Sequence, residues 1–259
     1  MADTKISALT AVSTPAGTDE FGVNQGGTSK KETLDQIKTY GNTAPVWAAG
    51  TASANTWPKL TPGTLLTTPE DGALEMDADC LYGTTDAGNR GQIPLRHFIR
   101  CDSARTLPND TNVNPIFNSP ANGTLTLETG TYLFEALLLI TGMSATSGNA
   151  LINIRGAGSA TIAAWLWLAQ GLDAVAAGTI ADDDSAYLTA EASAASVVAA
   201  AVNTVLRLHL RGTFEVTAAG TLIPSIDLVT AAAASVAIGS FFMCERIGST
   251  SVASVGQWT

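Results

Sequence analysis

The sequence predicts a mainly β protein, in which a C-terminal β-sandwich or jelly roll follows an extended β strap and a small N-terminal anchor. Three observations predict this fold. Several C-terminal segments alternate apolar and polar residues with a period of two, as half-buried strands do. These segments are separated by glycine-rich turns, with no helical pattern between them. Only 14% of the residues are charged, against roughly 25% in an average globular protein, which suits β-sheet surfaces that are covered in an assembly.

Residues 1–44 form the predicted anchor. Two short strand-like segments flank Gly26 and Gly27, which predicts a hairpin with a glycine turn, and a helical pattern follows as far as Gly41. A hairpin and one short helix cannot bury a sufficient core alone, so we expect this unit to dock on another surface. The apolar residues expected to make that contact are Phe21, Val23, Leu34 and Ile37.

Residues 45–110 form the predicted strap, or β shaft. Their composition is rich in proline, glycine and threonine, as in "APVWAAGTASANTWPKLTPGTLLTTPEDG", which predicts extended chain with few internal hydrogen bonds. Alternation within residues 72–85 predicts one short pair of strands. A loop-rich stretch of this length is uncommon inside a compact domain. We therefore expect several copies of the chain to wrap around one another here, as a homotrimer.

Residues 111–259 form the predicted sandwich domain. The segment 123–142 contains two strands separated at Thr129 and Gly130, and residues 218–229 and 236–248 predict further strands. Residues 204–216 alternate strictly around a bend at Gly212. The leucines expected to face the core are Leu206, Leu208 and Leu210, and the polar face holds Arg207, His209 and Arg211. Residues 190–203 fit either a helix, because of their alanines, or a loop followed by a strand; the second is favoured.

Charge and cysteine usage exclude several classes of protein. The net charge is −10 and no stretch is rich in lysine and arginine, which argues against binding to nucleic acid. The longest apolar run, residues 131–143, is shorter than the roughly 20 residues that span a bilayer, so no membrane insertion is expected. Cys80, Cys101 and Cys244 form no pair at close spacing, which predicts free thiols and assembly in a reducing cytoplasm.

No catalytic, cofactor or metal site is predicted. The two histidines, His97 and His209, lack neighbouring ligands at metal-binding spacing, and no nucleophile or metalloprotease motif is present. The aspartates 182–184 lack the spacing of a calcium loop, so an exposed acidic turn is favoured. Trp165 and Trp167 could form a sugar-stacking platform, but core or inter-subunit packing is the preferred interpretation.

A cluster of carboxylates lies in the strap. It consists of Glu70, Asp71, Glu75, Asp77 and Asp79. Two such carboxylates could serve a glycoside hydrolase, but turn signals crowd this stretch. The glycine-rich segment 155–160 lacks the lysine of a phosphate-binding loop, and a turn between strands is predicted there.

Three stretches, taken in order, resemble structural proteins of tailed-bacteriophage virions of the fibre and decoration type. "TKISALTAV…TDEFGVNQGGTSKKETLDQIKTY" is similar to their N-terminal attachment segments. "TPGTLLTTPEDGALEMDADCLYGTTDAGNRGQIPL" resembles their middle strap, although Gly83 interrupts a strand that such straps often continue. "GTLTLETGTYLFEALLLITGMS", "GTFEVTAAGTLIPSIDLV" and "GSFFMCERIG" resemble their C-terminal jelly roll, a fold similar to the trimeric tumour-necrosis-factor and complement-type heads.

The resemblance implies a non-enzymatic homotrimer of the virion, assembled in the host cytoplasm. Residues 1–44 would anchor it to other phage proteins of the tail, the baseplate or the capsid, and the sandwich would project outward. The implied function is that of a short tail fibre or receptor-binding adhesin, with a host-surface glycan or receptor as a further class of partner. The alternatives are a capsid decoration (cement) or head-fibre protein, and a glycan-degrading tailspike, which would usually be a longer chain.

Overall fold

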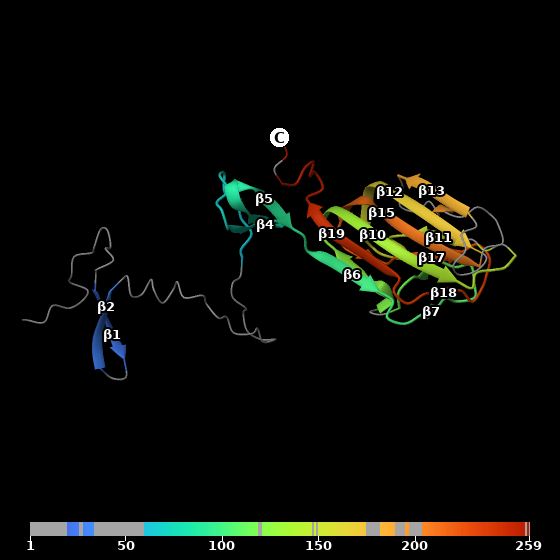
Figure 1. Ribbon diagram of the computed structural model, residues 1–259, viewed down its shortest axis with the longest axis horizontal. Helices are drawn as coiled ribbons and strands as arrows, with labels where there is room; N and C mark the ends of the chain where they lie inside the picture. Colours follow the sequence, from blue (N-terminus) through green and yellow to red (C-terminus); the bar gives the residue numbers. More distant parts are fainter. Residues whose placement is uncertain are drawn as a thin grey trace, which may run out of the picture. The chain divides into compact units, whose positions relative to one another are not determined.

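The structure is a computed structural model that describes residues 20–25, 28–33, 60–118, 121–146, 148, 150–174, 182–189, 195–196, 204–256 and 258. It divides into two compact units, residues 1–59 and residues 60–259, and each is treated by itself. Of the described residues, 51% are in strands and 2% are in helices, and the strands form several antiparallel sheets (Figure 1). The prediction of a mainly β sandwich fold is confirmed.

The first unit contains a hairpin of β1 (Glu20–Gln25) and β2 (Thr28–Thr33). The antiparallel register places Phe21 opposite Glu32 and Val23 opposite Lys30, and it leaves two residues between the strands. The structure thus has the hairpin that the sequence predicts. Leu34, Ile37 and the short helix predicted around them lie outside the described residues.

The second unit is a sandwich whose larger layer is an eight-stranded sheet, called here the large sheet. Its strands lie side by side in the order β13-β12-β15-β10-β19-β6, and β18 and β7 continue the sheet from the end of β10 (Figure 1). Their bounds are β6 Arg96–Arg100, β7 Arg105–Thr106, β10 Gly130–Thr141, β12 Thr161–Ala174, β13 Asp182–Leu188, β15 Val205–Ala218, β18 Ser235–Val236 and β19 Phe241–Gly248.

The opposite layer is smaller. Its four-stranded sheet runs β14-β11-β17-β8, and a separate pair joins β16 to β9. The bounds are β8 Asn114–Pro115, β9 Leu125–Leu127, β11 Ala150–Asn153, β14 Ala195–Ser196, β16 Gly220–Leu222 and β17 Ser225–Leu228. The chain crosses between the layers from β10 to β11 and back to β12, and again from β15 to β17 and back to β19, so strands that are neighbours in one sheet are often not consecutive. Such crossings between two antiparallel layers are typical of a β-sandwich.

One continuous hydrophobic core fills the space between the layers. Alternate residues of β10 and β15 enter it, and Leu138 lies directly opposite Leu208 in their register. The three leucines predicted to face inward on β15 are at most 1% exposed. Trp165 and Trp167 are also buried in this core, and Trp165 packs against Phe214 with ring centroids 5.1 Å apart. The two tryptophans therefore pack in the core, which agrees with the interpretation preferred from the sequence, and they do not form a surface platform.

The bend predicted at Gly212 coincides with an irregularity in the neighbouring strand. The register of β12 on β15 shifts between Ala163 and Leu166, which marks a β-bulge, and Ala164 there has φ of 49°. A Cβ on Gly212 would lie 2.3 Å from the carbonyl oxygen of Leu166. The bulge brings this backbone so close that only glycine fits opposite it.

A three-stranded sheet, called here the small sheet, precedes the sandwich in the chain. It consists of β3 (Leu74–Met76), β4 (Leu81–Thr84) and β5 (Arg90–Ile93), in that order. The sheet lies inside residues 45–110, which the sequence analysis assigned to a strap. The same range supplies β6 and β7, and Cys101 and Leu107 are buried in the sandwich core. The large sheet thus begins before residue 111.

Some local expectations change in the structure. The aspartates 182–184 do not form a turn: they open β13, where Asp183 pairs with Leu172 of β12, because pairing with a neighbouring strand overrides the local turn preference of aspartate. Residues 155–160 do form a turn between β11 and β12. Within residues 190–203 the structure describes only the strand β14. The three cysteines are free and buried, as predicted. Among the described residues, no helix has the length and apolar character to cross a membrane.

We expect Leu208→Ala to destabilise the sandwich strongly. Leu208 is 0% exposed, and truncating a buried leucine costs about 2–5 kcal/mol through lost burial and the cavity that remains. The matched control is Leu66→Ala, since Leu66 is 43% exposed outside the sandwich. Denaturant unfolding, followed by intrinsic fluorescence, measures both free energies. Equal losses for the two variants would contradict the assignment of β15 to the core.

Candidate functional site

The side of the large sheet that faces away from the core, called here the outer sheet face, carries an unusual number of large apolar side chains. Leu133, Leu137, Leu166 and Phe98 are between 44% and 58% exposed. Leu139 on β10, Leu168 on β12, and Phe241 and Met243 on β19 are half-buried residues on the same face. A solvated sheet face is normally polar, and contiguous apolar surface on a soluble protein marks an interaction site.

The strand register arranges these side chains in rows across the sheet. In one row, Leu168, Arg211, Glu135, Met243 and Phe98 lie side by side on β12, β15, β10, β19 and β6. The next row contains the adjacent Leu137 and Phe241, and the ring of Phe241 stacks on that of Phe98 with centroids 5.6 Å apart. The apolar residues thus lie on four strands of this face, β12, β10, β19 and β6, and β15 places polar side chains between those of β12 and β10.

Charges of both signs lie between the apolar side chains. The Nε2 of His209 lies 3.1 Å from the Oε1 of Glu135, and the guanidinium of Arg96 lies 3.1 Å from the Oε2 of Glu245. Arg211 stands opposite Glu135 in the register, which adds a further positive group to this face. A face with interleaved positive and negative groups can pair with a surface on which the signs are arranged in the opposite way.

Two shallow hollows flank Leu133 on this face. One, of about 160 Å³, is lined by Arg96, Glu135 and Met243 among others. The second, of about 350 Å³, lies between Leu133 and Leu166. Protruding leucines beside hollows of side-chain size provide the surface relief with which two protein faces interlock.

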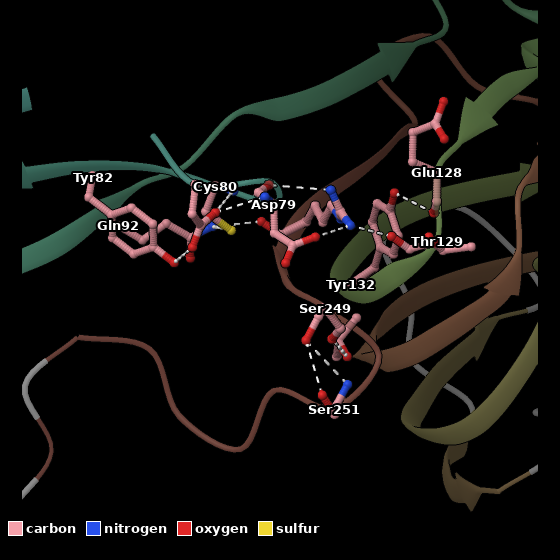
Figure 2. Close-up of polar contacts among 12 residues, drawn as sticks. Asp79, Cys80, Tyr82, Gln92, Glu128, Thr129, Tyr132, Ser249 and Ser251 are labelled. Carbon is pink, nitrogen blue, oxygen red and sulfur yellow. Dashed lines mark hydrogen bonds and ion pairs between the residues drawn. The ribbon is translucent and has the colours of Figure 1, made fainter. Parts of the chain in front are cut away.

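Arg246 joins the small sheet to the sandwich, and two of its partners, Asp79 and Thr129, are labelled in Figure 2. It lies on β19, and its guanidinium donates to the Oδ1 of Asp79 at 2.5 Å and to the carbonyl oxygen of Thr129. Its own carbonyl oxygen accepts a hydrogen bond from the side-chain amide of Gln92 on β5 at 2.8 Å. One residue of the sandwich therefore contacts two segments of the small sheet, which fixes that sheet against the end of the large one.

The turn that presents Asp79 to Arg246 is organised by Asp77. The Oδ1 of Asp77 accepts from the backbone N–H groups of Asp79 and Cys80, both at 2.7 Å, and its Oδ2 accepts from the hydroxyl of Tyr82 at 3.0 Å. Partial burial opposes ionisation of Asp77. The hydrogen bonds, with the nearby charge of Arg246, outweigh it and lower the pKa of this carboxyl. Burial raises the pKa of the Cys80 thiol beside it.

Three of the strap carboxylates, Glu75, Asp79 and Asp71, make contacts within the fold. Glu75 pairs with Arg90 at 2.9 Å, Asp79 pairs with Arg246, and Asp71 accepts from the backbone of Gly88 at 2.8 Å. Each of these carboxylates thus has a structural partner in the fold. His97 and His209 lie on different strands, β6 and β15. No cluster of histidine, cysteine and acidic side chains that could hold a metal ion occurs among the described residues.

Sequence reasoning missed most of the outer sheet face. In "TYLFEALLLITG" both sets of alternate positions are apolar, so no pattern shows that Leu133 and Leu137 point away from the core. The sequence of β15 did contain a signal. Its polar positions mark the outer sheet face, and β10 is paired with β15 in the same sheet. Arg246 gave no local signal, because its partners are more than 100 residues away in the chain. Comparison with known protein families and with curated proteins finds no match to this chain.

Replacing Arg246 with leucine is expected to release the small sheet while the sandwich stays folded. The change removes the guanidinium bonds to Asp79 and Thr129 and keeps the one bond from Gln92 to the carbonyl oxygen of residue 246. Hydrogen–deuterium exchange should accelerate in residues 74–93 and stay unchanged in β10 and β15. The control is Arg96→Leu, which removes an exposed ion pair elsewhere. Unaltered exchange in residues 74–93 would show that Arg246 is not the connection.

The lowered pKa of Asp77 predicts a loss of stability in acid. The folded pKa lies below the unfolded value of about 3.9, so the stabilisation is fully present above that value and is lost as the pH falls through the folded pKa. In Asp77→Asn this part of the pH dependence should be absent. Denaturant unfolding gives the free energy of unfolding at about pH 6 and at about pH 3. The difference between these two free energies should be smaller in the variant than in the wild-type protein. An equal difference would mean that Asp77 does not contribute.

Proposed function

We propose that this protein is a non-enzymatic, homotrimeric structural protein of a tailed-bacteriophage particle, acting as a short tail fibre or receptor-binding adhesin. Residues 1–44 anchor it to other virion proteins, and the sandwich projects outward. The observation that carries the assembly is the apolar outer sheet face. The phage assignment and the number of three copies rest on the resemblance of the anchor, strap and jelly-roll sequences.

The size of the outer sheet face supports self-association. Successive outward side chains lie about 7 Å apart along a strand, and neighbouring strands lie about 5 Å apart. Four such rows across the five strands therefore cover roughly 500 Å² of sheet. A specific interface buries about 800 Å² on each partner. The face therefore supplies a large share of one contact, and neighbouring loops and the small sheet can supply the remainder.

The character of the face supports a second copy of this chain as its partner. Half-exposed leucines lie beside hollows, and Glu135 and Glu245 are interleaved with Arg96 and Arg211. The chain carries a net charge of −10, so a contact between copies needs local groups of opposite sign to offset the overall repulsion. This face supplies both signs beside apolar side chains, which can pack on a different part of the neighbouring copy around a three-fold axis.

We expect Leu137→Glu to break the assembly without unfolding the subunit. Leu137 is 50% exposed on the outer sheet face, so the carboxylate is tolerated in a free subunit, but it would be desolvated without a partner in an interface. Light scattering coupled to size-exclusion chromatography should show a trimer for the wild-type protein and a monomer for the variant. Circular dichroism should be the same for both.

The matched control is Leu66→Glu, because Leu66 is similarly exposed but lies away from the outer sheet face; it should remain trimeric. A wild-type protein that stays at the 26.5 kDa of one chain at micromolar concentration would overturn the proposal. The phage assignment has its own readout: purified particles should contain the full-length protein and should lack a variant without residues 1–44. A few trimers per particle indicate a fibre, and hundreds of chains indicate capsid decoration.

A further inference from the structure

A second candidate contact surface lies on the small sheet, apart from the outer sheet face. A hollow of about 750 Å³ opens over one side of this sheet. Gly83 and Gly91 are paired directly across β4 and β5 and form its floor, and Leu74 and Ile93 border it. On the opposite side it is lined by the C-terminal segment, with Val255, Gly256 and Trp258.

The floor is bare backbone. A Cβ placed on Gly91 would meet no atom within 4 Å, and one on Gly83 would meet only the side chains of Ile93 and Leu74. Two glycines at one cross-strand pair leave a flat strip of peptide between apolar side chains. Such glycine positions in sheets are covered by aromatic rings that lie flat on the backbone.

Most polar side chains around the hollow are already bonded within the chain; the exception among the described lining residues is Thr84, whose hydroxyl is buried and has no hydrogen-bond partner. The hydroxyl of Thr85 donates to the carbonyl oxygen of Asn89 at 3.2 Å, and the Asn89 side chain donates to the carbonyl oxygen of Asp86 at 3.1 Å. The guanidinium of Arg90 is held by Glu75 and by the carbonyl oxygen of Leu66. A sugar or a charged ligand would find few free partners here, so the hollow favours a flat apolar group.

Trp258 supplies such a group on the same surface. It is 79% exposed, the largest exposed fraction among the large apolar residues that the structure describes. Its indole Nε1 donates to the carbonyl oxygen of Val255 at 2.6 Å, which holds the ring at the rim of the hollow, outside the floor. Each chain therefore presents a projecting aromatic ring and, beside it, a hollow with a flat floor that could accommodate such a ring. This hollow is called here the seat.

We propose that the hollow is the seat for Trp258 of a neighbouring copy. This inference rests on the proposed homotrimer. Trp258 of each copy would enter the hollow of the next copy. With three-fold cyclic symmetry this series of contacts closes after three copies. Seating an indole buries on the order of 150–250 Å². The contact is therefore an addition to the outer sheet face, and it fixes the small sheet and the C-terminal segment of adjacent copies to one another.

Thiol cross-linking between two co-expressed chains tests the seat. One tagged chain carries Leu74→Cys at the border of the hollow, and a differently tagged chain carries Val255→Cys on the C-terminal segment; Trp258 is kept in both. The native cysteines are buried and provide a low background. A short bis-maleimide should link the two tags in the trimer, and Trp258→Ala in the second chain should abolish the link.

Filling the seat provides the matched comparison. Gly91→Leu places a side chain in the open space over the floor, and it should abolish the cross-link while the protein remains folded and trimeric. Gly63→Leu also adds a side chain where no atom lies within 4 Å, but outside the hollow, and it should leave the link unchanged. A trimer that gives no link, or a link that survives Gly91→Leu, overturns this inference alone. A monomeric wild-type protein overturns the proposed function with it.

Discussion

The pairing of β10 with β15 is the constraint on which the rest of the second unit depends. These two strands lie at the centre of the large sheet, in register from Gly130 opposite Val216 to Thr141 opposite Val205. Side chains alternate between the two faces of a sheet, so a slip of β15 by one residue would turn Leu208 outward and carry Arg207 into the core. The cost of burying an unpaired charge fixes the register. The same register therefore decides which residues form the core and which remain on the outer sheet face.

How far the sequence predicts this arrangement depends on how local each signal is. The alternation around Leu208 and the break at Thr129 and Gly130 lie within single strands, and both predicted features are present in the structure. The addition of β6 and β7 to the large sheet depends on partners about 130 to 150 residues away, and no local pattern reveals it. The turn predicted at residues 182–184 is wrong for the same reason. The outer sheet face could be predicted only in part. The polar positions of β15 identify this face, but both sides of β10 are apolar, so its sequence does not show which side faces outward.

The two surfaces proposed for contacts between copies differ in how they are stabilised. The outer sheet face belongs to the sandwich, whose core holds its strands rigidly. The seat over Gly83 and Gly91 belongs to a three-stranded sheet too small to have a large core, and that sheet is fixed to the sandwich mainly through Arg246 and the turn around Asp77. A guanidinium that contacts both Asp79 and Thr129 is sensitive to position, since its planar donors match only one geometry. The orientation of the small sheet is therefore set by hydrogen bonds, whereas that of the outer sheet face is set by packing.

The two ends of the large sheet are formed by strongly charged strands. β6 carries Arg96 and Arg100, and β13 begins with three consecutive aspartates. Charged edge strands discourage backbone pairing with the sheet of another molecule. The charged residues of β6 and β13 therefore oppose growth of the large sheet by edge-to-edge pairing, which leaves its faces as the surfaces open to contact.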